Sequence, residues 1–272
     1  MKLHHYTTIE NLALILNSKK IRFSRLTTVD DTEESENFGE YNIAPFIFVS
    51  CWTTNNVESI PLWKMYTGNM RGVRISFDGK PFHMRKLEIN SSLPITIEGE
   101  VESPLTIEQI FNPECFVLPE FITNADFGGE VEYTDDLAGI YQDAVKITRN
   151  DDGSVNMSIS GASSIAKHKS KVWAFQEEYR FNLMAFPAPK EGYTKDTFNN
   201  FHNLYVNAVY FGSSPRNNYI DVDLCPEKLN NMTITLGPLA TISEKIIVNS
   251  LIQEYCPGAK VVDSSLKNKI RK

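Results

Sequence analysis

The feature that most constrains the fold is a nearly continuous apolar run at residues 45–52, which contains F-I-F-V-S-C-W. A strand that is covered on both faces has such a sequence, because neither face meets water. We therefore predict a central strand here. Further strands are predicted at residues 3–6, 21–24, 72–77, 207–212 and 260–263.

Helical patterns alternate with these strands. Thr7 and Glu10 have the T-x-x-E spacing of a capping box, which predicts that a helix begins there. Residues 242–255 have the apolar stripe of an amphipathic helix. Trp63 and Tyr66 would share one face of a short helix. Because strands and helices are mixed and strands predominate, the predicted class is α+β.

The pattern weakens between about residues 80 and 165. A helix is predicted at residues 106–111, and residues 144–148 and 155–160 flank N-D-D-G, which is typical of a hairpin. We interpret this region as a variable insertion in a single domain that spans residues 1–272.

Composition limits the classes of function. The chain has 272 residues and a formal net charge of −7, so nucleic-acid binding would need a local basic patch. Four widely spaced cysteines and the adjacent pair His4 and His5 give no metal-ligand spacing. The start M-K-L-H-H-Y lacks the apolar segment of a signal peptide, and no apolar run would span a membrane. We expect a cytoplasmic protein with no metal and no membrane contact.

Residues 171–181, K-V-W-A-F-Q-E-E-Y-R-F, set two adjacent acids in an aromatic run. If the run is a strand, Glu178 shares a face with Gln176 and Arg180, and Glu177 points away. Taken alone, it is typical of an edge strand with a solvated ion pair of little energetic weight. The acidic segment at residues 30–36 is expected to face solvent, or else to orient a ligand or a basic neighbour.

The chain has no G-x-G-x-x-G after a strand, no Walker A loop, no H-E-x-x-H and no G-x-S-x-G. Other short motifs occur in order. They are L-H-H-Y-T-T-I-E-N-L at residues 3–12, I-R-F-S-R at 21–25, D-D-T-E-E at 30–34, S-C-W-T at 50–53, W-K-M-Y at 63–66, G-V-R-I-S-F at 72–77 and W-A-F-Q-E-E-Y-R at 173–180. This series resembles a bacterial family of unknown function that is itself similar to the ADP-ribosyltransferases. The chain departs from the family at Gln176, where the first Glu of an E-x-E motif is common, and at Thr32, where Pro is usual.

The resemblance implies an ADP-ribosyltransferase-like split two-sheet core that grips NAD in a cleft, with flanking helices and the central insertion. It implies that His5 binds the NAD ribose, that Tyr66 stacks on nicotinamide, and that Glu178 engages the 2′-hydroxyl of the nicotinamide ribose. These three are the implied catalytic residues. Further implied NAD contacts are Tyr6, Thr7, Arg22, Ser24, Arg25, Trp63 and Arg180, with the arginines on the pyrophosphate. Gln176 would take part in acceptor selection.

The chemistry of NAD cleavage accounts for these residue types. Breaking the bond between nicotinamide and ribose builds positive charge on the sugar, and a carboxylate held beside it stabilises that charge. The same carboxylate can accept a proton from the acceptor nucleophile. An aromatic ring against nicotinamide adds stacking and excludes water.

Three hypotheses follow. The first is an NAD-dependent mono-ADP-ribosyltransferase, a toxin or antiphage defence effector similar to the DarT and CmdT kinds, which modifies a macromolecule. The alternatives are an NAD glycohydrolase on the same fold and a non-catalytic nucleotide-binding or interaction domain. We favour nucleic acid such as RNA over protein as the acceptor, and an antitoxin or chaperone partner is expected by analogy. A basic groove that would support a nucleic-acid acceptor could form from Arg71, Arg74, Arg85, Lys86, Lys167, Lys169 and Lys171.

Overall fold

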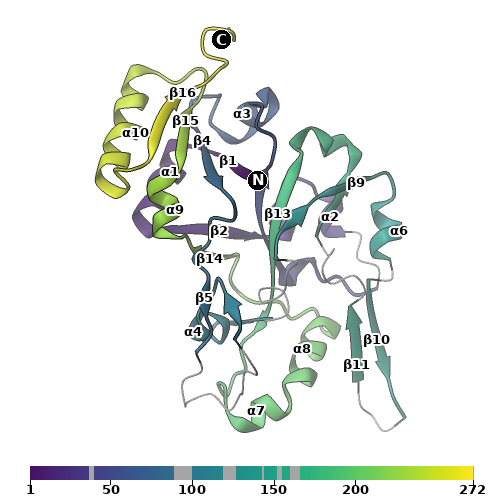
Figure 1. The fold of residues 1–272 in the computed structure, drawn as a ribbon. Helices are drawn as coiled ribbons and strands as arrows, with labels where there is room; N and C mark the ends of the chain where they lie inside the picture. The colour runs from purple at the N-terminus through teal and green to yellow at the C-terminus, as the bar shows by residue number, and fades with distance from the viewer. Residues whose placement is uncertain are drawn as a thin grey trace.

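The computed structural model describes residues 1–36, 40–88, 100–118, 127–142, 144–151, 155–159 and 166–271. Within these ranges the chain is a mixed α+β structure built around one large sheet (Figure 1). The predicted α+β class is therefore confirmed. In the described ranges, no helix combines the length and the apolar character needed to cross a membrane.

β3 (Ile47–Thr53) occupies the centre of the sheet, as its apolar run predicts. Along its whole length it pairs with the long strand β13 (Glu178–Pro187), from Glu178 opposite Thr53 to Met184 opposite Ile47. The order across the sheet is β14 (Tyr219–Asp223), β2 (Lys20–Arg25), β3, β1 (Lys2–Thr7), β4 (Val73–Asp78), β15 (Thr233–Leu236) and β16 (Lys260–Asp263). The strands predicted at residues 3–6, 21–24, 72–77 and 260–263 are thus present.

On its other edge β3 has only brief partners. β1 meets it at His4 opposite Thr53, and β2 meets it at Val49 and Phe48. β1 instead runs along β4 for its full length, and β2 runs along β14. Pairing along this edge of β3 is therefore interrupted between Val49 and Thr53, where side chains from three strands converge.

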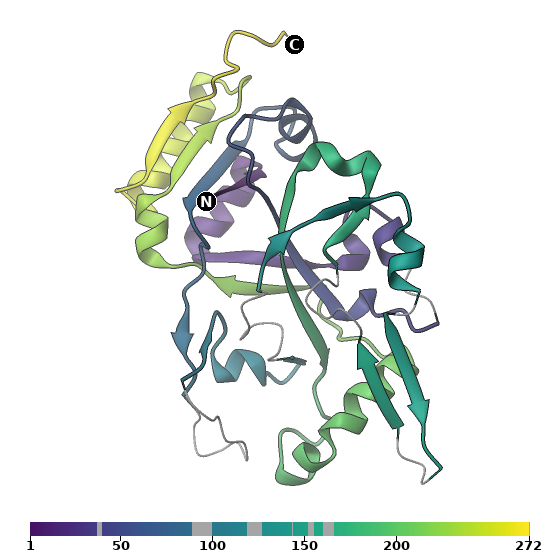
Figure 2. The ribbon, with the colours of Figure 1, turned by 45° about the vertical axis from the view of Figure 1, so that its right-hand side comes forward.

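Several helices pack against the strands of the sheet. α1 (Ile9–Ser18) and α10 (Ile242–Tyr255) contact each other on one side (Figures 1 and 2). The cap of α1 is Thr8, which accepts from the backbone of Asn11, whereas the predicted cap Thr7 still belongs to β1. The other helical segments are η1 (Leu26–Thr28), α2 (Glu33–Glu36), η2 (Ala44–Phe46), α3 (Ile60–Tyr66), α4 (Ile107–Ile110), α6 (Leu137–Tyr141), η3 (Lys171–Gln176), α7 (Lys195–Asn199), α8 (Phe201–Tyr210) and α9 (Pro226–Asn231).

Two strand predictions are wrong. Residues 207–212 belong mostly to α8, because the buried residues Val206 and Val209 recur at helical spacing and the helix packs on β13. Residues 171–176 form the 3-10 helix η3, and β13 begins only at Glu178.

The described part of residues 80–165 is built into the core. β7 (Cys115–Val117) and β8 (Gly129–Glu130) both pair with β13. The predicted hairpin is present as β10 (Val145–Arg149) and β11 (Val155–Ile159), and the predicted helix as α4. Smaller pairings join β5 (Arg85–Lys86) to β6 (Glu102–Ser103), and β9 (Glu132–Thr134) to β12 (His168–Ser170).

Phe127 ties this region to the main sheet. Its ring lies 5.2 Å from the ring of Phe181 and 5.3 Å from that of Phe82. A Phe127→Ala variant should lose about 3–5 kcal/mol of unfolding free energy in one transition, as measured by denaturant unfolding. Phe175→Ala, on a ring that is 40% exposed, is the control and should have little effect. A separate early transition in the Phe127 variant would show instead that the region unfolds independently.

Candidate active site

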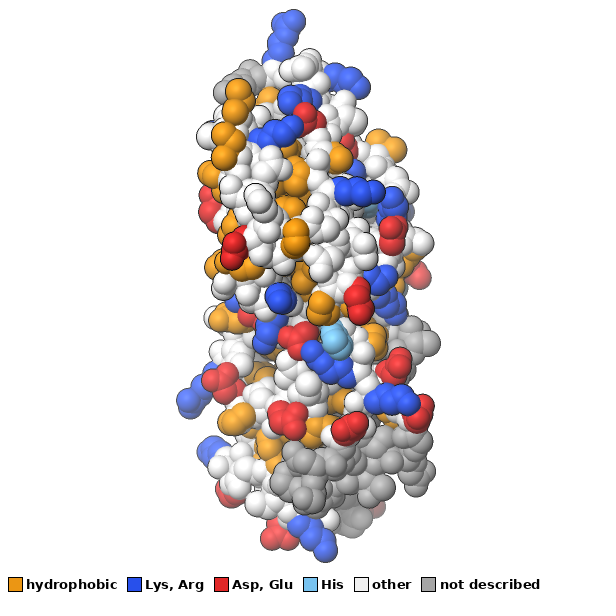
Figure 3. Space-filling view, turned by 60° about the vertical axis from the view of Figure 1, so that its left-hand side comes forward, with side chains coloured by type: hydrophobic (Ala, Val, Ile, Leu, Met, Phe, Trp, Pro, Cys, Tyr) orange, Lys and Arg blue, Asp and Glu red, His pale blue; other side chains and the backbone are white. Residues whose placement is uncertain are grey.

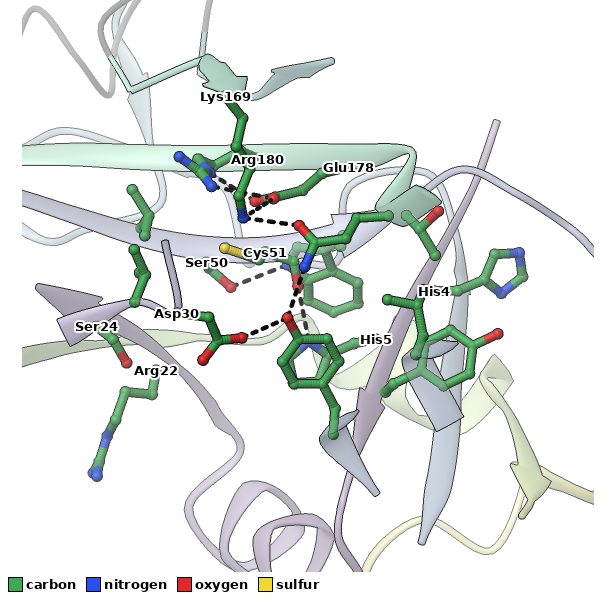
Figure 4. A pocket seen from close by; sticks show the side chains of 18 of the residues that line it. His4, His5, Arg22, Ser24, Asp30, Ser50, Cys51, Lys169, Glu178 and Arg180 are labelled. Atoms are coloured by element: carbon green, nitrogen blue, oxygen red, sulfur yellow. Dashed lines mark hydrogen bonds and ion pairs between the residues drawn. The ribbon is translucent and has the colours of Figure 1, made fainter. Parts of the chain in front are cut away.

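A cavity of about 240 Å³ lies beside β3 where its pairing with β1 and β2 is interrupted. Its wall includes His5 from β1, Tyr66 from α3 and Glu178 from β13. The structure therefore brings together the three residues that the resemblance implies are catalytic, although they come from three distant segments. Figure 4 shows the cavity from close by, with His5 and Glu178 labelled among the side chains that line it.

Glu178 and Arg180 share one face of β13, as predicted. The Arg180 guanidinium donates from Nε to Glu178 Oε1 at 2.6 Å and from Nη2 to Oε2 at 3.1 Å. Glu178 is 5% exposed and Arg180 is fully buried, so this is not the solvated edge pair that the run suggests in isolation. A buried ion pair survives only if its remaining donors and acceptors are also used.

Glu34 supplies those remaining contacts. Its carboxylate accepts two hydrogen bonds from the Arg180 guanidinium, one of them from Nη2 to Oε1 at 3.1 Å, and Arg180 Nη1 also donates to the Ala166 carbonyl at 2.8 Å. Glu34 is 1% exposed, so the acidic segment turns this residue inward rather than to solvent. Sequence reasoning missed Glu34 as a site residue. No sequence signal singles out Glu34, because the burial of Arg180, which requires a second carboxylate, shows only in the fold.

Lys169 of β12 is the second buried cation. Its Nζ donates to Gln176 Oε1 at 2.8 Å and lies 3.2 Å from Glu34 Oε1 and 3.4 Å from Glu178 Oε2. We call Glu34, Lys169, Glu178 and Arg180 the charge cluster. Two carboxylates and two cations balance within it, which offsets much of the cost of burying each charge.

The charge cluster keeps Glu178 ionised. Burial acts to raise the pKa of Glu178, but Arg180 and Lys169 outweigh burial and hold the pKa below its usual value. The Cys51 side chain lines the same cavity and acts in the same direction on the pKa of Glu178. Burial, together with the charge of Glu178, raises the pKa of Cys51, so the thiol stays protonated.

A second set of hydrogen bonds leads away from Lys169. Gln176 Nε2 donates to the Tyr66 hydroxyl at 2.8 Å, and that hydroxyl donates to Asp30 Oδ2 at 2.6 Å. The direction is set by the ends, because an ammonium only donates and a carboxylate only accepts. Burial and Asp30 raise the pKa of Tyr66, so its hydroxyl remains a donor.

The position of Gln176 differs from the one that acceptor selection would require. It is 5% exposed, and both ends of its amide are bonded within the protein. Acceptor selection would need a free amide group at this position. The structure instead gives Gln176 a place between Lys169 and Tyr66.

His5 faces the cavity as a neutral ring. Burial lowers its pKa, and Nδ1 lies 2.9 Å from the Cys51 carbonyl, which can only accept. Nδ1 therefore carries the proton, and Nε2 is left as an acceptor. The ring also packs on Trp52 with centroids 5.0 Å apart. His4 also touches the wall, but its nitrogens bond to Ser76 and Asn56, and Figure 4 shows its ring directed away from Glu178.

The other implied NAD contacts divide into two groups. Tyr6, Arg22 and Ser24 lie on the cavity wall. The Arg22 guanidinium bonds to Asp221 and stacks over the Tyr219 ring at 3.4 Å, and its side chain is 53% exposed. Arg22 therefore lies at the rim with part of its surface open.

Thr7, Arg25 and Trp63 lie away from the cavity wall. Trp63 is fully buried against Tyr6 in a second apolar cluster, so it cannot flank a ligand. The Arg25 guanidinium donates to the Ser214 hydroxyl and to the backbone carbonyls of Pro215 and Asn217. Arg180 does reach the wall, but its donors bond to Glu178, Glu34 and the Ala166 carbonyl, so the structure gives no support to a contact with the pyrophosphate.

The candidate basic groove does not assemble from the seven residues that could form it. Four of them form ion pairs with acidic side chains: Arg71 with Glu244, Arg85 with Asp223, Lys86 with Glu100 and Lys171 with Asp135. The other three, Arg74, Lys167 and Lys169, are buried. On the face in Figure 3, Lys and Arg side chains are interspersed with Asp and Glu. This arrangement gives no support to a nucleic-acid acceptor.

In the part of the chain that the structure describes, no group of three or more His, Cys, Asp or Glu side chains could hold a metal ion. Comparisons with protein-family models, with curated proteins and with solved structures found no match. The site is therefore interpreted from its own geometry.

Removing Glu34 should strongly destabilise the protein. A Glu34→Gln variant leaves Arg180 and Lys169 buried against a single carboxylate, and breaking such a cluster costs about 3–5 kcal/mol of unfolding free energy. Denaturant unfolding should show this loss, whereas Glu36→Gln, on an exposed neighbour in α2, should change the value by less than about 0.5 kcal/mol. Equal effects of the two substitutions would contradict the central place of Glu34.

Acidification should destabilise the fold through His4. Burial, with Arg74, lowers the pKa of His4 from 6.5 to about 4. Between these values the unfolded chain binds a proton that the folded chain does not, so stability is full above pH 6.5 and falls as the pH drops. From pH 7 to pH 5 the loss should be about 2 kcal/mol in unfolding free energy.

A His4→Asn variant should lose this part of the pH dependence, while His202→Asn, on an exposed ring, should keep it. Unfolding measured at pH 7 and pH 5 tests the expectation. The same pH dependence in wild type and in His4→Asn would show that His4 does not carry it.

Proposed function

We propose that this protein cleaves NAD and transfers its ADP-ribose to a macromolecule, as an ADP-ribosyltransferase does. The proposal depends on one observation, which is the convergence of His5, Tyr66 and Glu178 on one cavity. The cavity also lies at the interrupted edge of β3, where a split-sheet fold of this kind would hold the nicotinamide end of NAD.

The size of the cavity favours part of NAD rather than all of it. About 240 Å³ is below the usual range for a site that encloses a whole drug-sized ligand. Nicotinamide and its ribose would occupy the cavity, and the diphosphate would leave over the rim past Ser24 and Arg22. Arg22 would share its donors between Asp221 and a phosphate oxygen.

The polar groups suit cleavage of the glycosidic bond. When the bond from ribose C1′ to nicotinamide breaks, its electron pair leaves with nicotinamide, which becomes neutral, and the ribose becomes an oxocarbenium ion. The ionised Glu178 carboxylate would stabilise that charge and bind the 2′-hydroxyl. His5 Nε2 would accept a hydrogen bond from a ribose hydroxyl, and the Tyr66 ring would lie against nicotinamide.

The acceptor then attacks C1′ and loses its proton, to Glu178 or to solvent. We name the acceptor only as a macromolecule, because the basic groove that would support the expected nucleic-acid acceptor does not assemble. A role as a toxin or defence effector with an antitoxin partner is an analogy with the proteins that the motifs resemble. With water as the acceptor, the same site would be an NAD glycohydrolase.

Labelled NAD incubated with the protein and a cell lysate tests the proposal. Wild-type protein should release nicotinamide and label a macromolecule, and Glu178→Gln should lower the rate about 10²–10³-fold. Glu177→Gln is the matched control and should stay within about twofold, because the Glu177 side chain is exposed and accepts a hydrogen bond from Asn55 at the surface.

Nuclease and protease treatment of separate samples then identifies the acceptor. Nicotinamide release without label would indicate the glycohydrolase. Neither release nor label would overturn both catalytic functions and leave a binding domain. Because Glu178→Gln also disturbs the charge cluster, circular dichroism should accompany the assay, and Tyr66→Phe provides a second variant that keeps the ring.

A further inference from the structure

Lys169 lies at the junction of two parts of the candidate site. Its ammonium has three donors and three acceptors within reach, at 2.8 Å from Gln176, 3.2 Å from Glu34 and 3.4 Å from Glu178. These partners come from η3, α2 and β13, while Lys169 itself belongs to β12. One side chain at the cavity wall therefore joins four elements. Figure 4 shows Lys169 beside Glu178 and Arg180.

Two arms meet at this ammonium. The carboxylate arm consists of Glu178, Arg180 and Glu34. The hydroxyl arm runs from Gln176 through the Tyr66 hydroxyl to Asp30. In the proposed function Glu178 stabilises the ribose charge and Tyr66 stacks on nicotinamide, and each of these two wall residues belongs to one arm.

We infer that Lys169 is a positioning residue that couples the two arms, so that Glu178 and Tyr66 keep one fixed geometry around the bound nicotinamide ribose. This inference rests on the proposed function. Lys169 acts through its neighbours, because its donors are used by protein acceptors and its residue is 3% exposed. The indole of Trp173 covers it at 4.8 Å, which further separates the ammonium from water.

A lysine suits this junction better than an arginine. The ammonium donates in three directions from one atom, whereas the donors of a guanidinium all lie in one plane. Arg180 already fills the planar position between the two carboxylates. The two cations therefore have different partners: Arg180 bridges Glu34 and Glu178, and Lys169 links these carboxylates to Gln176.

Removing the Lys169 charge leaves one buried cation facing two buried carboxylates. The charged or titratable groups that face Glu178 are Arg180, Lys169, Glu34, Cys51, Tyr133 and Tyr66, from β13, β12, α2, β3, β9 and α3. Of these, Arg180 and Lys169 hold the carboxyl ionised against burial. Without the Lys169 charge, only Arg180 among these cations opposes the effect of burial, so the pKa of Glu178 should rise.

The test uses the full chain with Lys169→Met, which keeps the length of the side chain and removes its charge. Lys171→Met is the matched control, since Lys171 is exposed and pairs with Asp135 on the surface. Glutamate carboxyl carbons labelled with ¹³C are titrated by NMR, and the Glu178 signal is assigned by its loss in Glu178→Gln. The titration midpoint of Glu178 should move to higher pH in Lys169→Met and stay unchanged in Lys171→Met.

Kinetics of NAD cleavage add a second readout. In Lys169→Met the acid limb of the pH–rate profile should move to higher pH, and kcat should fall about 10²-fold with KM nearly constant, because orientation rather than binding is lost. Lys169→Arg should retain the low titration midpoint of Glu178 but still lower kcat, because the charge is kept and the link to Gln176 is not. This variant also serves if Lys169→Met fails to fold.

The outcomes separate the two proposals. If wild-type protein releases no nicotinamide, the proposed function fails, whatever the titration shows. If wild type is active but the Glu178 midpoint and kcat are the same in Lys169→Met as in wild type, the coupling by Lys169 is overturned and the proposed function stands. Full activity in Lys169→Arg would also overturn it, because charge alone would then be sufficient.

Discussion

The site depends on the burial of two carboxylates and two cations together. Any one of these charges would be too costly to bury alone, and each pair leaves donors or acceptors that only the other pair can use. Arg180, which is fully buried, needs both Glu34 and Glu178. The charge cluster therefore acts as a single structural unit that joins β13, β12 and α2.

The local structure of the acidic segment follows from this unit. α2 has four residues, too few to be stable as an isolated helix, and Glu34 is its buried residue. The contact of Glu34 with Arg180 and Lys169 helps to fix its position, together with the packing of α2 against β12, η1 and η2. The neighbouring Asp30 is then held where it can accept the hydrogen bond from Tyr66. Stability and site geometry thus share the same contacts, so substitutions in the charge cluster should affect both.

The sequence predicted best what depends on local pattern. The apolar run of β3, the alternation of β4 and the hairpin of β10 and β11 can all be recognised from neighbouring residues. The helix α10 forms as predicted, but its apolar stripe does not pack as expected, because Ile246 and Ile247 are 60% and 50% exposed. Contacts between side chains that are far apart in the sequence cannot be recognised from such local patterns. Glu34 is 146 residues from Arg180, and nothing in the spacing of an acidic segment identifies which of its members turns inward. Lys169 was likewise grouped with surface cations, because burial of a lysine shows only in the fold.

The stretch before Glu178 shows how a wrong secondary structure can still place its neighbours correctly. Strand alternation predicted Glu178 inward and Glu177 outward, yet Glu177 lies in the left-handed region with φ of 42° and ends a 3-10 helix. The Thr53 hydroxyl donates to the Glu177 carbonyl and holds this turn.

The turn sends the Glu177 side chain to Asn55 at the surface, while Gln176 before it and Glu178 after it both reach Lys169. A non-glycine residue in this conformation costs roughly 1–2 kcal/mol and persists only where its surroundings require it. The apolar run of residues 171–176 has no clear period, so alternation could not be distinguished from a helical turn there. The left-handed turn at Glu177 therefore ends the 3-10 helix where a strand was predicted. The same turn brings Gln176 and Glu178, one from each arm, to the Lys169 ammonium.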